Sequence, residues 1–97
     1  MVVLNWTPQS ILYLTNISEF IAKDSPKYAI ITIRKIKKLA KQLKLHSFFG
    51  RKLPKINQTN IREIIFGNYR IIYKIISDER IDILTVHHSA KRLSDIL

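Results

Sequence analysis

The stretch that decides the fold reads Ile61-Arg-Glu-Ile-Ile-Phe-Gly-Asn-Tyr-Arg-Ile-Ile-Tyr-Lys-Ile75. Two runs rich in β-branched and aromatic residues flank Gly67-Asn68, a pair that suits the tight turn of a β-hairpin. Such a short loop fixes the register, so the predicted facing pairs are Phe66 with Tyr69, Ile64 with Ile71, and Arg62 with Tyr73. The opposite face of the hairpin then carries a Glu, an Arg and a Lys among isoleucines: Ile61, Glu63, Ile65, Arg70, Ile72 and Lys74. We expect function on this second face.

Two amphipathic helices are predicted before the hairpin. Thr7-Pro8 and Ser25-Pro26 each place a capping hydroxyl before a proline, which favours a helix start at both points. The first helix should run from about Pro8 to Lys23, with an apolar stripe of Tyr13, Leu14, Ile17, Phe20 and Ile21. The stripe of the second helix comprises Ile30, Ile33, Ile36, Ala40 and Leu43. The two helices should pack as an antiparallel pair.

The other segments predict a small, largely antiparallel sheet of four strands. A first strand is expected at 2–5, the hairpin strands at 61–66 and 69–76, and a last strand at 81–87. Residues 46–60 contain Gly50 and Pro54 and should form a loop, and Ser89 should cap a short C-terminal helix. The order β-α-α-β-β-β predicts one α+β domain over residues 1–97, with a two-helix hairpin packed on the sheet. The pairing partner of the first strand is left open.

Composition argues against several classes of protein. The chain has no cysteine, and therefore neither a disulfide framework nor a thiolate metal site. Adjacent residues of a strand diverge, so His87-His88 is no metal motif, and we expect no metal and no cofactor. The first residues lack the pattern of a signal peptide, and no apolar run approaches the roughly 18 residues of a membrane span. We expect a cytoplasmic protein without membrane contact.

The charge distribution points to a polyanionic partner. Seventeen Lys and Arg stand against seven Asp and Glu, which gives a formal net charge of +10. Between Asp24 and Glu63 the chain has eleven basic residues and no acidic one. Such a field attracts nucleic acid, the ribosome or an acidic protein. The alternative is a solvated basic helix face that keeps the protein soluble.

The hairpin and its neighbouring segments resemble the toxins of bacterial type II toxin–antitoxin pairs in the RelE/ParE superfamily. Four segments carry the resemblance, in matching order and spacing: Gly50 to Pro54, Ile61 to Ile64, Gly67 to Tyr73, and Ile83 to Leu93. The resemblance implies a RelE/ParE-like fold and a growth-inhibiting toxin. It also implies a cognate antitoxin that neutralises the toxin by wrapping an extended, helix-containing segment over its basic surface.

Arg70 and His88 are the candidate catalytic residues if the chain is a ribonuclease. A guanidinium can hold a phosphate through two parallel hydrogen bonds, and histidine transfers protons near neutral pH. The resemblance implies these roles, since RNA-cleaving relatives carry an Arg and a His at matching positions. Two alternatives are open: Arg70 forms a salt bridge with Glu63 on the same face, and His88 is a residue that ParE-like sequences carry without nuclease activity.

The sequence departs from the nuclease patterns of the superfamily. Lys55 and Ser89 stand where one RNA-cleaving branch has Glu and Tyr, and Ile61 and Glu63 stand where the RelE branch has lysines. A full acid/base pair is missing, so whether the chain is an enzyme is left open. We favour ParE-like inhibition of DNA gyrase. The alternatives are ribosome-dependent mRNA cleavage and a non-catalytic, basic nucleic-acid-binding module that uses the second helix.

The surface that meets the target or the antitoxin is expected to be charged. Its candidate residues are Arg51, Lys55, Arg62, Glu63, Lys74, Lys91 and Arg92. The alternatives are that Arg51 anchors the loop and that Arg62 pairs with Glu19 or Asp82.

The aromatic residues outside the hairpin are expected to be structural. Phe48 and Phe49 should pack the loop onto the helices, with base stacking as the alternative if the pair is exposed. Trp6, Tyr13 and Tyr28 should lie in the core or at its rim.

Overall fold

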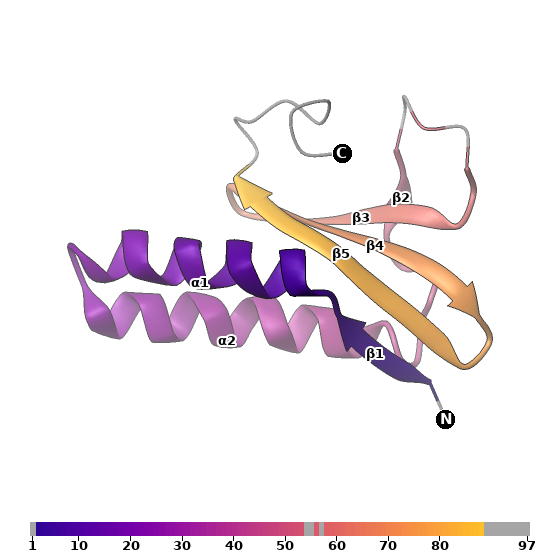
Figure 1. Cartoon of the computed structure of the whole chain (residues 1–97), viewed down its shortest axis with the longest axis horizontal. Helices are drawn as coiled ribbons and strands as arrows, with labels where there is room; N and C mark the ends of the chain where they lie inside the picture. The colour runs from indigo at the N-terminus through magenta and orange to yellow at the C-terminus, as the bar shows by residue number, and fades with distance from the viewer. Residues whose placement is uncertain (1, 54–55, 57, 89–97) are drawn as a thin grey trace.

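The computed structural model describes residues 2–53, 56 and 58–88, and the elements follow a β-α-α-β-β-β-β order (Figure 1). They are β1 (Val3–Trp6), α1 (Pro8–Ala22), α2 (Pro26–Gln42), β2 (Arg51–Lys52), β3 (Ile61–Phe66), β4 (Tyr69–Ser77) and β5 (Arg80–His88). The predicted α+β class is confirmed. The predictions for Lys55, Lys91, Arg92 and a C-terminal helix after Ser89 lie outside the described residues.

The strands form one sheet in the order β1-β5-β4-β3-β2. β1 pairs with β5 in parallel, and the remaining neighbours pair antiparallel. The sheet has five strands rather than the predicted four, because β2 lies within the segment predicted as a loop. β2 is two residues long, with Arg51 opposite Glu63 and Lys52 opposite Arg62. A strand of this length is too short to show an alternating pattern in the sequence.

Both helices begin where the sequence predicted. The Thr7 side chain accepts a hydrogen bond from the Ser10 N–H at 3.2 Å, and the Ser25 side chain accepts one from the Tyr28 N–H at 3.1 Å. Each cap satisfies a backbone donor that the first turn of the helix leaves without a partner. The helices lie antiparallel to each other on one side of the sheet (Figure 1).

The core lies between the two helices and the facing side of the sheet. Its buried side chains are Leu14 of α1, Ile36 and Ala40 of α2, Leu43 just after α2, and Ile64, Ile71, Tyr73, Ile81, Ile83 and Val86 of the strands. Phe20 and Ile30 of the predicted stripes are exposed instead, at 70% and 54%. The predicted apolar stripes are therefore wider than the faces that the sheet covers.

The hairpin has the register that the sequence predicted. Phe66 faces Tyr69, Ile64 faces Ile71, and Arg62 faces Tyr73. Gly67 has a φ of 56°, and no other residue in the described part of the chain has a positive φ. Positive φ at the first turn residue alone is the pattern of a type II′ turn. The turn thus fixes which hairpin side chains face the helices and which face away.

A β-bulge in β5 ties the start of α1 to the sheet. Tyr73 pairs with Ile83 and Ile72 pairs with Thr85, so Leu84 is the extra residue in β5. The Thr7 hydroxyl lies 2.8 Å from the Ile83 carbonyl oxygen and 3.1 Å from that of Leu84. One threonine therefore caps α1 and also holds that helix against the bulge.

β1 is fixed to β5 by side chains as well as by the backbone. Asn5 donates a hydrogen bond to Asp82 at 3.1 Å, and Arg80 forms an ion pair with the same carboxylate at 2.8 Å. The hydrogen bond from Arg80 holds the pKa of Asp82 below its usual range.

None of the helices in the described chain is long and apolar enough to cross a bilayer.

Tyr73 connects the core to the segment between α2 and β2. Its ring is fully buried, and its hydroxyl accepts a hydrogen bond from the Gly50 N–H at 2.9 Å and donates one to the Ser47 carbonyl at 2.8 Å. Burial raises the pKa of Tyr73. A Cβ at Gly50 would lie 2.6 Å from the Glu63 carbonyl oxygen and 2.7 Å from the Tyr73 hydroxyl oxygen. Only glycine fits this contact.

Three aromatic predictions are wrong in this region and on α2. Phe48 is 66%, Phe49 is 55% and Tyr28 is 60% exposed, so none of them is a core residue. For the phenylalanines the reason is that the Tyr73 hydroxyl, through its hydrogen bonds to Ser47 and Gly50, holds the backbone of this segment against the core. Trp6 and Tyr13 are half-buried, and Trp6 packs against the core as predicted.

Replacing Gly50 with alanine should destabilise the fold by about 1–3 kcal/mol, because the added methyl group overpacks a site with no spare space. The free energy of unfolding in urea measures the effect. Gly67→Asn is the matched control, since nothing lies within 4 Å of a Cβ there and asparagine tolerates positive φ. Equal stability of Gly50→Ala and the native chain would contradict the close contact of Gly50 with Tyr73 and the Glu63 carbonyl.

Candidate functional site

The hairpin register separates two sets of side chains. Ile71 and Tyr73 point into the core beneath the helices, so Arg70 and Ile72 point to the other side of the sheet. We call that side the far face. Its central residues come from three adjacent strands: Glu63 of β3, Arg70 and Ile72 of β4, and Thr85 and His87 of β5. The far face is the one on which the sequence predicted function.

A buried carboxylate between two arginines lies on the far face. The Glu63 side chain has no exposed surface, and its two oxygens lie 2.7 Å from Arg51 Nε and 3.5 Å from Arg70 Nη1. Burial of a charge without a partner is costly, so this carboxylate depends on its arginines. The Arg70 side chain is 27% exposed and that of Arg51 is 57% exposed. The salt bridge that the sequence offered as the alternative role of Arg70 is therefore formed.

The two candidate catalytic residues do not share a face. Arg70 lies opposite His87 in the register, while His88 lies opposite Tyr69. The His88 and Tyr69 rings meet edge to face, with centroids 5.7 Å apart and planes at 87°. His88 therefore projects toward the helix side of the sheet, and Arg70 projects toward the far face.

The histidine beside Arg70 is His87 and not the candidate His88. His87 is 3% exposed, and its Nδ1 lies 2.9 Å from the His88 carbonyl oxygen. The bulge at Leu84 decides this arrangement. Without the bulge, the pairing that runs from Ile81 to Ile83 would continue, Arg70 would face Val86, and His88 would lie on the face of Arg70. Leu84 carries no sequence signal that marks it as the bulged residue.

Arg62 is an anchor of the segment before β2. It donates to the Gly50 carbonyl from Nη1 at 2.9 Å and to the Thr59 carbonyl from Nε at 3.2 Å. Its guanidinium carbon also lies 4.8 Å from the centre of the Phe48 ring. The suggested pairing of Arg62 with Glu19 or Asp82 is not among the ion pairs of the described residues, and Asp82 is bonded to Arg80 and Asn5 instead.

Lys74 completes the candidate residues that the structure describes. It is half-buried on the far face, opposite Asp82. Its ammonium contributes to the low pKa of that carboxyl. The candidate residues are thus divided: Glu63, Arg51, Arg70 and Lys74 are on the far face, and Arg62 and His88 are on the other.

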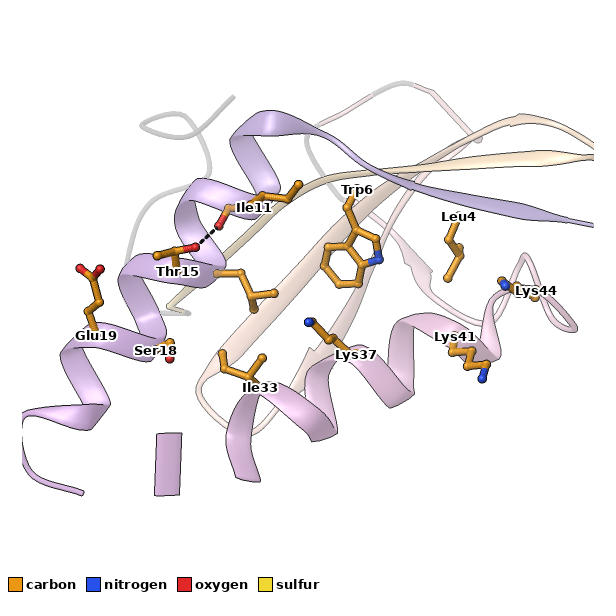
Figure 2. Close-up of a pocket in the computed structure, with 11 residues that line it drawn as sticks. Leu4, Trp6, Ile11, Thr15, Ser18, Glu19, Ile33, Lys37, Lys41 and Lys44 are labelled. Carbon is orange, nitrogen blue, oxygen red and sulfur yellow. Dashed lines mark hydrogen bonds between the residues drawn. The ribbon is translucent and has the colours of Figure 1, made fainter. Parts of the chain in front are cut away.

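A groove of about 720 Å³ lies between α1, α2 and β1 (Figure 2). Its apolar lining comes from all three elements: Leu4 and Trp6 of β1, Ile11 and Leu14 of α1, and Ile33 of α2. Lys37, Lys41 and Lys44 follow one side of α2 and its C-terminal end along the groove, while Glu19 lies on α1. Sequence analysis missed this groove, because its lining comes from segments whose packing no local pattern reveals.

The groove has the chemistry of a peptide-binding surface. Lys37 and Lys41, four residues apart, lie on the same side of α2, and Lys44 follows the end of the helix, so three lysines border the apolar lining. An amphipathic segment with apolar residues on one side and carboxylates on the other would match both parts.

Within the described residues, no cluster of three or more His, Cys, Asp or Glu side chains could hold a metal ion.

Glu63→Gln should destabilise the protein by roughly 1.5–3 kcal/mol, because a neutral amide cannot neutralise the two guanidinium groups that meet at this carboxylate. Urea unfolding measures the change in the free energy of unfolding, and the dependence of that free energy on urea concentration should stay the same. Glu79→Gln is the control, since Glu79 is exposed in the β4–β5 turn and should change stability by less than about 0.5 kcal/mol. Equal effects of the two substitutions would show that the Arg51–Glu63–Arg70 cluster contributes nothing to the fold.

Two solved structures share this fold. The structure described as the chromosomal ParDE TA system from P. aeruginosa has a TM-score of 0.74 at 19% identity and covers 91% of this chain and 96% of its own. The YoeB dimer from Staphylococcus aureus has a TM-score of 0.58 at 21% identity and covers 87% of this chain and 92% of its own. At these identities the likeness shows the fold alone.

Comparison with protein families gives a match over almost the whole chain. No curated protein matches the chain. The model of the family described as the ParE toxin of the type II toxin–antitoxin system parDE matches residues 4–93. This match covers nearly the whole chain and confirms the predicted superfamily, and the chain therefore belongs to the ParE toxin family of type II toxin–antitoxin systems.

Proposed function

We propose that this ParE-family toxin arrests growth by binding and inhibiting DNA gyrase, without a catalytic step of its own. The observation that carries the proposal is the placement of Arg70 and His88 on opposite faces of the sheet. Both residues would have to act on one scissile phosphate if the toxin cleaved RNA. Inhibition by binding makes no such demand on them.

The chemistry of RNA cleavage sets a geometric requirement. One group must take a proton from the 2′-hydroxyl, another must protonate the leaving oxygen, and both must lie within hydrogen-bond reach of a single phosphate. A strand directs successive side chains to opposite faces, so residues on different faces cannot meet around one phosphate. Arg70 is also engaged by the buried Glu63 carboxylate at 3.5 Å, and that carboxylate would repel a phosphate brought to the same guanidinium.

Ribosome-dependent mRNA cleavage is the rival function. His87 lies opposite Arg70 on the far face, and this is the observation that favours it. His87 is 3% exposed, however, and a general acid or base must reach its substrate. The burial of His87 therefore supports the gyrase proposal over the rival.

The cognate antitoxin is the second partner, and we propose that it lays an acidic amphipathic segment into the groove between α1, α2 and β1. The apolar lining would take the apolar side of that segment, and Lys37, Lys41 and Lys44 would meet its carboxylates. The surrounding charge supports an acidic partner, since the chain carries a formal net charge of +10.

The purified toxin should inhibit DNA supercoiling by gyrase in vitro, and its induction should arrest growth without new RNA cleavage. His88→Ala and Arg70→Lys should act like the native toxin, because neither is required to perform chemistry. Arg70→Lys keeps a positive charge beside Glu63, so the fold should survive. Mapping of RNA 5′ ends shortly after induction reads out cleavage in cells. Cuts at fixed codon positions that disappear in both variants would instead establish a ribosome-dependent ribonuclease.

The double substitution Lys37→Glu/Lys41→Glu should weaken antitoxin binding by more than about tenfold, because it places like charges in the groove. The control is Lys35→Glu/Lys38→Glu, an equal change of charge at exposed positions of α2 that do not line the groove. Calorimetric titration with the cognate antitoxin, which we expect to be an acidic protein encoded beside this gene, gives both affinities. If the two double variants lose affinity equally, attraction is set by overall charge and the groove is not the docking site.

A further inference from the structure

The segment between α2 and β2 exposes three large apolar side chains within five positions. Leu45 is 82%, Phe48 is 66% and Phe49 is 55% exposed. We call residues 45–52 the aromatic loop. Single exposed apolar residues are common on protein surfaces, but a group of them marks an interaction site.

The fold fixes the backbone of the aromatic loop. Tyr73 bonds to Ser47 and Gly50 on either side of the two phenylalanines, at 2.8 Å and 2.9 Å. The Phe49 N–H donates to the His46 carbonyl at 3.0 Å, which closes the intervening turn. Because Tyr73 is a fully buried core residue, the loop has little freedom to turn its phenylalanines inward. Their exposure is a property of the native fold.

Cationic groups surround these rings. The Arg62 guanidinium carbon lies 4.8 Å from the centre of the Phe48 ring, and bonds to Gly50 and Thr59 hold that guanidinium in place. Arg51 and Lys52 follow directly on β2, and both are exposed. The sequence from 25 to 62 contains no acidic residue. An exposed ring backed by a cation and flanked by further cations is the arrangement that binds bases and phosphates together.

We propose that the aromatic loop binds an unpaired nucleic-acid strand, with Phe48 and Phe49 stacking on bases and Lys52 contacting the phosphates. Only unpaired bases offer their faces for stacking, so a duplex should bind less well. An apolar peptide is the less suitable occupant, because these side chains are exposed among cations and are not part of the lining of the groove between α1, α2 and β1. The inference goes beyond gyrase inhibition and antitoxin binding, neither of which requires contact with an unpaired strand.

Fluorescence anisotropy of a labelled oligothymidine with the purified full chain tests the proposal. The native protein should bind the single strand more tightly than a duplex of equal length. Phe48→Leu/Phe49→Leu keeps the apolar surface and removes the aromatic faces, and it should weaken single-strand binding by about tenfold or more. Lys52→Ala should reduce the slope of log affinity against log salt by roughly 0.7, the value for one phosphate contact with a single strand.

Phe20→Ala is the matched control, since Phe20 is 70% exposed but lies on α1, away from the aromatic loop. It should bind the single strand like the native chain. Ultraviolet cross-linking of the bound strand should label the peptide that contains Phe48 and Phe49. Native affinity of the double leucine variant, or a cross-link confined to α2, would overturn the proposal.

Two further results separate this inference from the proposed function. If the leucine variant loses antitoxin or gyrase binding while its single-strand affinity stays native, the loop is a protein-binding site and the inference fails. If the toxin binds the single strand through the loop but leaves gyrase active, the inference stands and the proposed function fails.

Discussion

The one-residue bulge in β5 is the constraint on which the rest of the structure depends. An extra residue at Leu84 shifts the pairing with β4 by one position, so that Val86 enters the core while His87 turns to the far face. The carbonyls around the bulge also accept the Thr7 hydroxyl, which caps α1. The entry of the first helix, the closing of the core and the composition of the far face therefore depend on one local irregularity.

The far face shows how a position associated with chemistry can serve the fold. Arg70 is one of two guanidinium groups that flank the buried carboxylate of Glu63. In a low-dielectric site such a carboxylate needs its counter-charges, and it therefore ties β2, β3 and β4 together through their side chains. An arginine used in this way is less available to a phosphate. This supports the proposal of a toxin that acts by binding, and it gives one departure from the nuclease patterns, Glu63 in place of a lysine, a structural role.

Two surfaces of the molecule are suited to different partners. The groove between α1, α2 and β1 combines an apolar lining with a row of lysines, which suits a segment with both apolar and acidic sides. The aromatic loop follows the C-terminal end of α2 and presents exposed aromatic rings among cations. Both use the basic stretch between Asp24 and Glu63, but one offers a hollow and the other offers exposed rings. A toxin that must reach its target when free and be covered when neutralised can use such separate surfaces.

The sequence alone determined the elements with strong local signals. The Thr-Pro and Ser-Pro pairs set both helix starts, and Gly67-Asn68 set the hairpin register, because capping and turn geometry depend on neighbouring residues. The sequence also indicated the superfamily, since four short segments match RelE/ParE toxins in the same order along the chain. Tertiary structure decided the strand β2, the parallel pairing of β1 with β5, the exposure of Phe48 and Phe49, and which histidine lies beside Arg70. Each of these depends on contacts between residues far apart in the chain. The pairing shift at Leu84 and the hydrogen bonds of Tyr73 to Ser47 and Gly50 arise only when the strands and helices pack, so no local pattern could reveal them.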